Sequence, residues 1–127
     1  MKEIWQPVPG KLGRKYAVSN YGRVRSLDAW VRNRYGVRLR LGRVLKPGKT
    51  TKGYLFVVLS DNSKQRPYSV HRLVGKVFVP NPTNLPEINH LDFDKSNNHF
   101  ENLEWTTRSG NNKHAHTDPK RRSTRKR

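Results

Sequence analysis

Apolar and polar residues alternate through much of the first half of the chain, which is the pattern of short β-strands. Two β-prone runs within Tyr16–Leu27 flank Asn20-Tyr21-Gly22, a turn signal. The alternation is strict in Gly36–Leu45, which predicts a strand with one apolar face and one basic face. The apolar face comprises Val37, Leu39 and Leu41, and the basic face comprises Arg38 and Arg40. A further β run is predicted at Tyr54–Leu59, with Pro67–Ser69 pairing back.

The period changes from that of a strand to that of a helix at Val70–Phe78. Apolar residues there recur at positions i, i+3, i+4, i+7 and i+8, so one face of a helix is apolar. Ser69 is a suitable N-cap, and Gly75 permits close packing at some cost to the helix. The prolines of residues 79–86 then end the helix. His71 lies off the apolar face and is predicted to be a helix-surface residue, with an approach to phosphate as the alternative.

The segment Glu87–His116 predicts a β-turn-β-α hairpin. A short strand is expected at Pro86–Leu91, a polar loop at Asp92–Asn98 and an extended run at Asn102–Thr106. Thr106 or Thr107 is placed to cap a helix from about Arg108 to about His116. The fold class is therefore α+β, a β-rich N-terminal segment followed by this hairpin. Its expected core comprises Ile88, Leu91, Leu103, Trp105 and the Val70–Phe78 helix.

Charge indicates what the protein binds. The 127 residues include 27 Lys and Arg against 9 Asp and Glu, a net charge of +18 that favours a polyanionic partner such as nucleic acid. A membrane surface is the alternative, but no long amphipathic basic helix stands out. The charge is uneven: Lys11–Lys49 holds twelve basic residues and one acid, whereas Glu87–Glu104 holds five acids and one lysine. The basic end, residues 117–127, is expected to be a disordered arm, lying on phosphates or keeping the protein soluble.

The chain contains no cysteine, which excludes disulfides and thiolate zinc sites, so no zinc is expected. The start, MKEIWQPVPG, lacks the apolar run of a signal peptide, and no stretch is apolar and long enough to span a membrane. A cytoplasmic location follows as the expectation, in the host cell if the gene belongs to a phage.

"INHLDFDKSNNHFENLEW" and "GNNKHA" resemble the signature of HNH nucleases with the ββα-metal fold, and most closely the small HNH homing endonucleases of phage genomes and introns. "EIWQPVPG…YAVSNYGRVRSL" resembles the modular DNA-binding segment that often precedes such nucleases. The resemblance implies a DNA-binding segment over residues 1–50 and an HNH nuclease domain over 51–116. The ββα-metal motif would occupy about 86–116, and a disordered basic tail 117–127.

The resemblance also implies the chemistry. Phosphodiester hydrolysis needs a base, a metal ion and an oriented phosphate. His90 would be the general base, and Asn102 would orient its ring through an amide oxygen. A single Mg²⁺ or Mn²⁺ would be held by Asn89 and Asn111, with Asn112 as the alternative to Asn111.

The position of Asn89 departs from the many relatives that have Asp there. A neutral amide binds a dication less tightly, so the scissile phosphate, Asp92 or Asp94 would have to compensate, or activity is low or lost. His114, one turn beyond Asn111, is a reserve metal ligand by its i, i+3 position. Arg108 is placed to contact the cleaved phosphate.

The basic strands would grip double-stranded DNA through Arg23, Arg25, Arg38 and Arg40. The predicted function is a metal-dependent DNA endonuclease of the HNH homing type, a monomer or weak dimer in which one hairpin makes one nick. Two alternatives stay open: a DNA-binding protein of the same fold with weak or no catalysis, and an RNA-binding protein.

Overall fold

The first sheet forms a small platform at the N-terminal end. The computed structural model describes residues 1–118, and within them every strand pairing is antiparallel. The sheet has the order β1-β2-β3, with a 3₁₀ helix, η1, between its first two strands. The bounds are Trp5–Pro7 for β1, Gly10–Arg14 for η1, Tyr16–Ser19 for β2 and Val24–Ser26 for β3. The predicted turn at residues 20–22 joins β2 and β3, and Gly22 takes a φ of +96° there.

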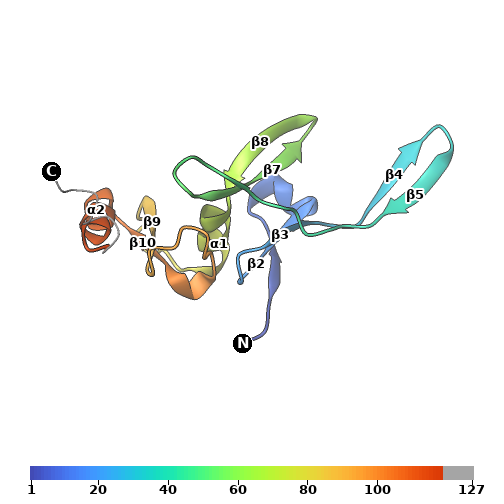
Figure 1. Cartoon of the computed structure of the whole chain (residues 1–127). Coiled ribbons are helices and arrows are strands. Elements are labelled where there is room, and N and C mark those ends of the chain that lie inside the picture. The colour runs from blue at the N-terminus through green and yellow to red at the C-terminus, as the bar shows by residue number, and fades with distance from the viewer. Residues whose placement is uncertain (119–127) are drawn as a thin grey trace.

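The second sheet is a two-stranded hairpin that projects away from the rest of the molecule (Figure 1). It pairs β4, Ala29–Asn33, with β5, Gly36–Arg40. All five residues of β5 are exposed, and so are Trp30 (72%) and Leu41 (70%). The strand begins where the alternation predicted it and ends at Arg40, and its predicted apolar face, Val37 and Leu39 with Leu41 beyond the strand, is exposed. Alternation fixes which residues share a face, and no second layer covers this one within residues 1–118.

The third sheet leads into the first α-helix. It has the order β6-β7-β8, with bounds Gly48–Lys49, Leu55–Asp61 and Lys64–Ser69. Helix α1, Val70–Phe78, follows β8 directly and occupies the residues that the apolar period predicted. Ser69 is its N-cap by position, but its side chain makes no capping hydrogen bond.

Helix α1 is the centre of one hydrophobic core shared by both ends of the chain. Its Val70, Leu73 and Val74 are buried. They pack with buried residues of the first sheet, of β7 and of the two strands that follow α1 in the chain. The partners are Val18, Val24, Val57, Leu59, Ile88 and Leu103. A Cβ added at Gly75 would lie 2.5 Å from Ile88 Cδ1, so the glycine is what lets α1 approach the next sheet closely.

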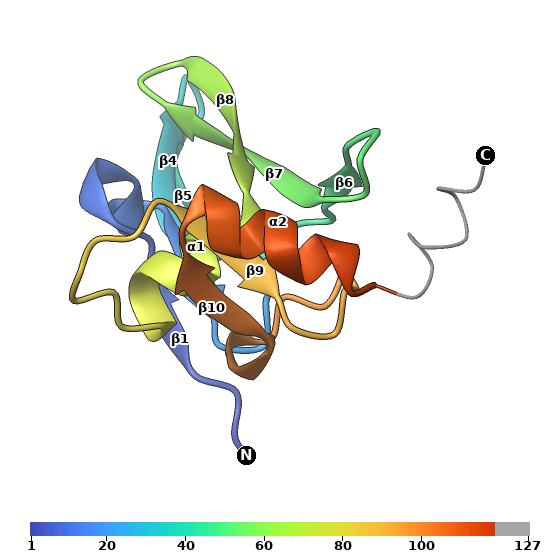
Figure 2. The same ribbon diagram turned by 90° about the vertical axis from the view of Figure 1, so that its left-hand side faces the viewer.

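The fourth sheet and the last helix form the predicted hairpin. Strand β9 spans Glu87–His90, a 3₁₀ helix η2 spans Phe100–Asn102, β10 spans Leu103–Thr106, and α2 spans Arg108–His116. Helix α2 packs against β9 (Figure 2). Thr107 caps it, with its hydroxyl oxygen accepting from the Gly110 amide at 3.0 Å.

The α+β class is thereby confirmed. Leu91 was expected in the core, but it is 43% exposed because the chain leaves β9 at His90. No helix within residues 1–118 combines the length and apolar character that crossing a membrane requires. The predicted disordered tail, 117–127, lies almost wholly outside the described residues.

Candidate active site

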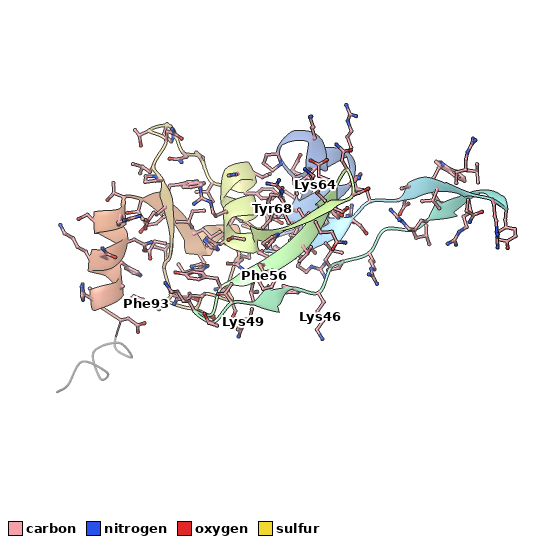
Figure 3. The ribbon with its side chains drawn as sticks, turned by 90° about the horizontal axis from the view of Figure 1, so that it is seen from above. Lys46, Lys49, Phe56, Lys64, Tyr68 and Phe93 are labelled. Atoms are coloured by element: carbon pink, nitrogen blue, oxygen red, sulfur yellow. The ribbon has the colours of Figure 1, made fainter. Side chains whose placement is uncertain are left out.

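A cavity of about 920 Å³ lies where β9, α2 and the loop after β9 meet. It is lined by four of the predicted site residues, Asn89, His90, Asn111 and His114. Because β9 ends at His90, two neighbouring residues that would point to opposite faces of a regular strand both reach this cavity. Figure 3 shows Phe93, which also lines the cavity, beside α2.

His90 is buried (5% exposed) and has a fixed ring orientation. Its Nε2 lies 2.8 Å from Oδ1 of Asn98, which is itself 3% exposed. An amide oxygen only accepts, so Nε2 donates and Nδ1 of the neutral ring is left as an acceptor. Burial lowers the pKa of His90, and the Asn98 contact and the charge of Asp92 partly oppose that shift. The ring is therefore neutral near pH 7, the state in which it can take a proton.

Asn102 has a different role from the one predicted. Its Oδ1 accepts from the Asp92 amide at 3.0 Å, and its Nδ2 donates to Asp92 Oδ1 and to the Asn97 carbonyl at 2.9 and 2.8 Å. Asn102 thus closes the loop between the strands, while Asn98 makes the contact with His90. The asparagine-rich loop was the signal available in the sequence, but spacing alone does not separate Asn98 from its neighbours.

Asn89 and Asn111 each have their amide nitrogen engaged and their amide oxygen available. Asn89 Nδ2 donates to Glu104 Oε1 at 3.1 Å. Asn111 Nδ2 donates to Glu87 Oε1 at 3.1 Å and to the Ile88 carbonyl at 3.4 Å. The Asn111 hydrogen bond, followed by that of Arg108, lowers the pKa of Glu87. Because Glu104 and Glu87 accept from the amide nitrogens, the two amide oxygens are left as possible ligands of a hard cation.

His114 adds a nitrogen donor to the same cavity. Its ring stacks on Phe93, with centroids 4.3 Å apart, and its Nε2 is buried without a hydrogen-bond partner among the described residues. In residues 1–118 there is no group of three His, Asp or Glu side chains arranged to hold a metal ion. A cation here would have two amide oxygens and one imidazole nitrogen as protein ligands. These ligands fit Mg²⁺ or Mn²⁺ when phosphate and water oxygens fill the remaining coordination positions.

The carboxylates of the loop after β9 are committed to the loop itself. Asp92 accepts from the Asp94 amide, from Asn97 and from Asn102, and Asp94 accepts from the Ser96 amide. The Asn97 hydrogen bond is the main reason why the pKa of Asp92 is lowered. The alternative that Asp92 or Asp94 replaces a missing carboxylate ligand is not favoured, because Glu87 and Glu104 are the carboxylates beside Asn111 and Asn89.

His71 is not the helix-surface residue that was expected. Its ring centroid lies 5.2 Å from that of His90 and 5.2 Å from that of Tyr54. Burial, with the charges of His90 and Arg72, lowers the pKa of His71 to about 4. The helical period put His71 off the apolar face, but Tyr54, just before β7, covers that side of α1. The packing of Tyr54 and His71 beside His90 is a tertiary contact, which the local sequence pattern does not predict.

The predicted arginines fall into separate groups. Arg108 Nε lies 3.3 Å from Glu87 Oε2, and the Arg108 side chain is 84% exposed. Arg23 pairs with Glu3 at 2.6 and 2.9 Å, and Arg25 stacks over the Trp5 ring, 4.4 Å from its centroid. Arg38 and Arg40 lie on the projecting hairpin, at the opposite end of the molecule from α2 (Figure 1).

Comparisons with known proteins agree with this geometry. Residues 3–60 match the NUMOD4 motif, and residues 68–113 match the HNH endonuclease family. The chain is 38% identical over 106 residues to an uncharacterised HNH endonuclease, L245, of Acanthamoeba polyphaga mimivirus, a match that covers 84% of this chain and 28% of that protein. It is 31% identical over 107 residues to the DNA endonuclease I-HmuI of Bacillus phage SP01, covering 84% of this chain and 54% of that protein.

A solved structure on DNA binding and cleavage by the HNH homing endonuclease I-HmuI is also similar, with a TM-score of 0.69 and 27% identity. The superposition covers 95% of this chain and 64% of that one. The chain thus spans only part of the length of these relatives. The resemblance inferred from the sequence is confirmed: a region that matches the NUMOD4 motif, residues 3–60, precedes a region that matches the HNH endonuclease family, residues 68–113.

Proposed function

We propose that this protein is a metal-dependent endonuclease that nicks double-stranded DNA, with His90 as its general base. The observation that carries the proposal is the buried imidazole of His90, held in one orientation by Asn98. Its Nε2 is held by Asn98, which leaves Nδ1 as the acceptor, and His90 lines the same cavity as Asn89 and Asn111. A fixed, unprotonated ring nitrogen is the group that deprotonation of a water molecule requires.

In this proposal Nδ1 of His90 takes a proton from the attacking water, and Nε2 keeps its own proton on the Asn98 oxygen. The hydrogen bond to Asn98 then stabilises the imidazolium that forms. Arg108 contacts the phosphate from the exposed edge of the cavity, where its guanidinium is free to shift from Glu87 toward a phosphate oxygen. Asn102 supports the reaction from a distance, by closing the loop that carries Asn98.

Asn89 and Asn111 would hold one Mg²⁺ or Mn²⁺ through their amide oxygens, and His114 is the further candidate ligand. When bound, the cation supplies charge stabilisation for the phosphate in the transition state. Because both amides are neutral, we expect the cation to bind weakly to the free protein and more tightly when a DNA phosphate contributes negative charge. Glu87 and Glu104 keep the two amides oriented.

The first part of the chain would supply the DNA grip. We propose residues 1–50 as the DNA-binding segment and residues 51–116 as the nuclease domain. Arg38 and Arg40 on the hairpin and Arg25 on the first sheet would contact backbone phosphates, with Arg23 joining them while paired to Glu3. The net charge of +18 provides the long-range attraction.

Incubation of the protein with supercoiled plasmid and Mg²⁺ or Mn²⁺ tests the proposal. We expect open-circular product, abolished by a chelator and reduced about a hundredfold or more in His90→Ala, since removal of a general base costs that much. DNA binding by His90→Ala should remain intact in a mobility-shift assay. Asn111→Ala should raise the metal concentration needed for half-maximal rate more than Asn112→Ala does.

Each rival function has its own outcome in the same assays. Tight DNA binding without metal-dependent nicking would indicate a non-catalytic DNA-binding protein of this fold. Preferential binding of structured RNA, measured by competition against duplex DNA, would favour the RNA-binding alternative. Nicking that persists in His90→Ala at the wild-type rate would exclude His90 as the base.

A further inference from the structure

The turn between β2 and β3 contacts the loop that precedes η2, although the two are far apart in the sequence. The Phe100 amide donates to the Asn20 carbonyl at 2.9 Å, and the Tyr21 ring stacks on the His99 ring with centroids 5.2 Å apart. Asn20 is buried (3% exposed). This contact joins the region that matches the NUMOD4 motif to the region that matches the HNH endonuclease family.

Gly22 brings the backbone of this turn directly against Asn98. A Cβ added at Gly22 would lie 2.8 Å from the Asn98 carbonyl oxygen and 2.9 Å from the Asn98 Cβ. Atoms at those distances overlap, so no larger residue fits without moving Asn98 or the turn. The positive φ of Gly22, +96°, is a second reason for glycine at this position.

The turn is also rigid from within. The Ser19 hydroxyl oxygen accepts from the amides of Tyr21 and Arg23 at 3.2 and 3.1 Å. Asn20 Oδ1 accepts from the Ile4 amide at 2.7 Å, and Asn20 Nδ2 donates to the Lys2 carbonyl at 3.2 Å. The turn is therefore a fixed support for whatever packs on it.

We propose that the Asn20–Gly22 turn is a positioning element for His90, acting through Asn98. The turn fixes the backbone of Asn98, and the Asn98 side chain fixes Nε2 of His90 at 2.8 Å. The proposed DNA-binding segment, residues 1–50, would thus also hold a residue of the candidate active site in place. The expected effect on the nicking rate rests on the proposed role of His90 as the base. The expected effect on the ring, a single tautomer of His90, does not depend on that role.

Gly22→Ala tests this proposal, with Gly10→Ala as the matched control. Gly10 also has a positive φ, +78°, but an added Cβ there meets nothing within 4 Å, so both variants strain the backbone and only one displaces Asn98. At saturating DNA and metal, we expect the single-turnover nicking rate of Gly22→Ala to fall about tenfold or more. The rate of Gly10→Ala should stay within about twofold, and DNA affinity should hold in both variants.

The tautomer of His90 gives a readout that does not depend on activity. Two-bond ¹H–¹⁵N spectra of the neutral ring should report a proton on Nε2 in the wild type and in Gly10→Ala, and a mixture of tautomers in Gly22→Ala. An unchanged tautomer and rate in Gly22→Ala would overturn the proposal. A slower rate with an unchanged tautomer would also overturn it, because the turn would then act by another route.

A second variant covers the case in which Gly22→Ala fails to fold. Tyr21→Ala removes the stack on His99 and leaves the backbone conformation free of new strain. We expect a smaller loss of rate, about threefold, with partial mixing of the His90 tautomers. A wild-type tautomer in Tyr21→Ala would then count against the proposal. If the wild-type protein does not nick DNA at all, the proposed function fails, while the spectra still decide whether the turn positions His90.

Discussion

The β4–β5 hairpin and the β9-to-α2 hairpin are both built from short strands, yet they hold their polar side chains in opposite ways. On β5, Arg38 and Arg40 extend from a strand whose residues are all exposed. In the cavity, His90, Asn89 and Asn111 are each fixed by a named partner: Asn98, Glu104 and Glu87. A grip on a long polyanion benefits from adjustable charges, whereas a reaction needs atoms that already lie in place.

The two hairpins also differ in what stabilises them. Leu103 of β10 is 4% exposed and belongs to the common core, whereas Leu39 of β5 is 43% exposed. Leu103→Ala should lower the free energy of unfolding by about 3 kcal/mol, because it leaves a cavity in a packed core. Leu39→Ala should lower it by less than about 1 kcal/mol. Urea denaturation of both variants checks this, and equal losses would mean that the hairpin is packed against something in solution.

The free energy of unfolding should depend on pH through His71, beside the candidate site, and not through the exposed hairpin. The pKa of His71 is about 4 in the folded protein and about 6.5 when unfolded. Between these values the unfolded chain binds a proton that the folded chain does not, so stability falls as pH falls through this window and is constant above it. We expect a loss of about 3 kcal/mol by pH 4 that is reduced in His71→Gln.

The control for the pH series is Arg38→Ala, on the exposed hairpin. Urea denaturation at each pH should give this variant the same dependence as the wild type. If His71→Gln keeps the full slope between pH 6.5 and 4, the dependence originates elsewhere and the burial of His71 is not its cause.

Arg38→Ala combined with Arg40→Ala gives the smallest expected effect and falls on DNA binding alone. If both residues make the proposed phosphate contacts, their removal should weaken affinity about tenfold and reduce the slope of log affinity against log salt by about two. The nicking rate at saturating DNA should not change, since neither residue is near His90. Fluorescence anisotropy at several salt concentrations measures the slope. A lower rate at saturation would mean that the hairpin also orients the scissile phosphate.

The local pattern of apolar and polar residues predicted the positions of helices and strands better than it predicted which of their faces are covered by other segments. The helical period at Val70–Phe78 and the hairpin from β9 to α2 are where the sequence placed them, because each element's own side chains encode its period. The period did not reveal that the apolar face with Leu39 is uncovered, nor that His71 is packed against Tyr54 and His90. Whether a face is covered depends on which distant segment packs on it, and alternation carries no information about that segment.

The same limit applies to the site. The sequence predicted that His90 ends a strand, as it does, but it did not predict that Asn98 rather than Asn102 contacts the His90 ring. Several asparagines lie within reach of the loop, and which one meets His90 depends on how Asp92 and the β2–β3 turn fold the loop. The division of the chain at residue 50 remains a prediction.

The uncovered strip formed by Val37, Leu39 and Leu41 also governs how the protein behaves during purification. An apolar strip of this kind promotes self-association, and only mutual repulsion between highly cationic molecules opposes it. Concentrated salt shortens the range of that repulsion to a few ångströms. Stock solutions should therefore cloud as ionic strength rises, and dilution into buffer of low ionic strength should clear them.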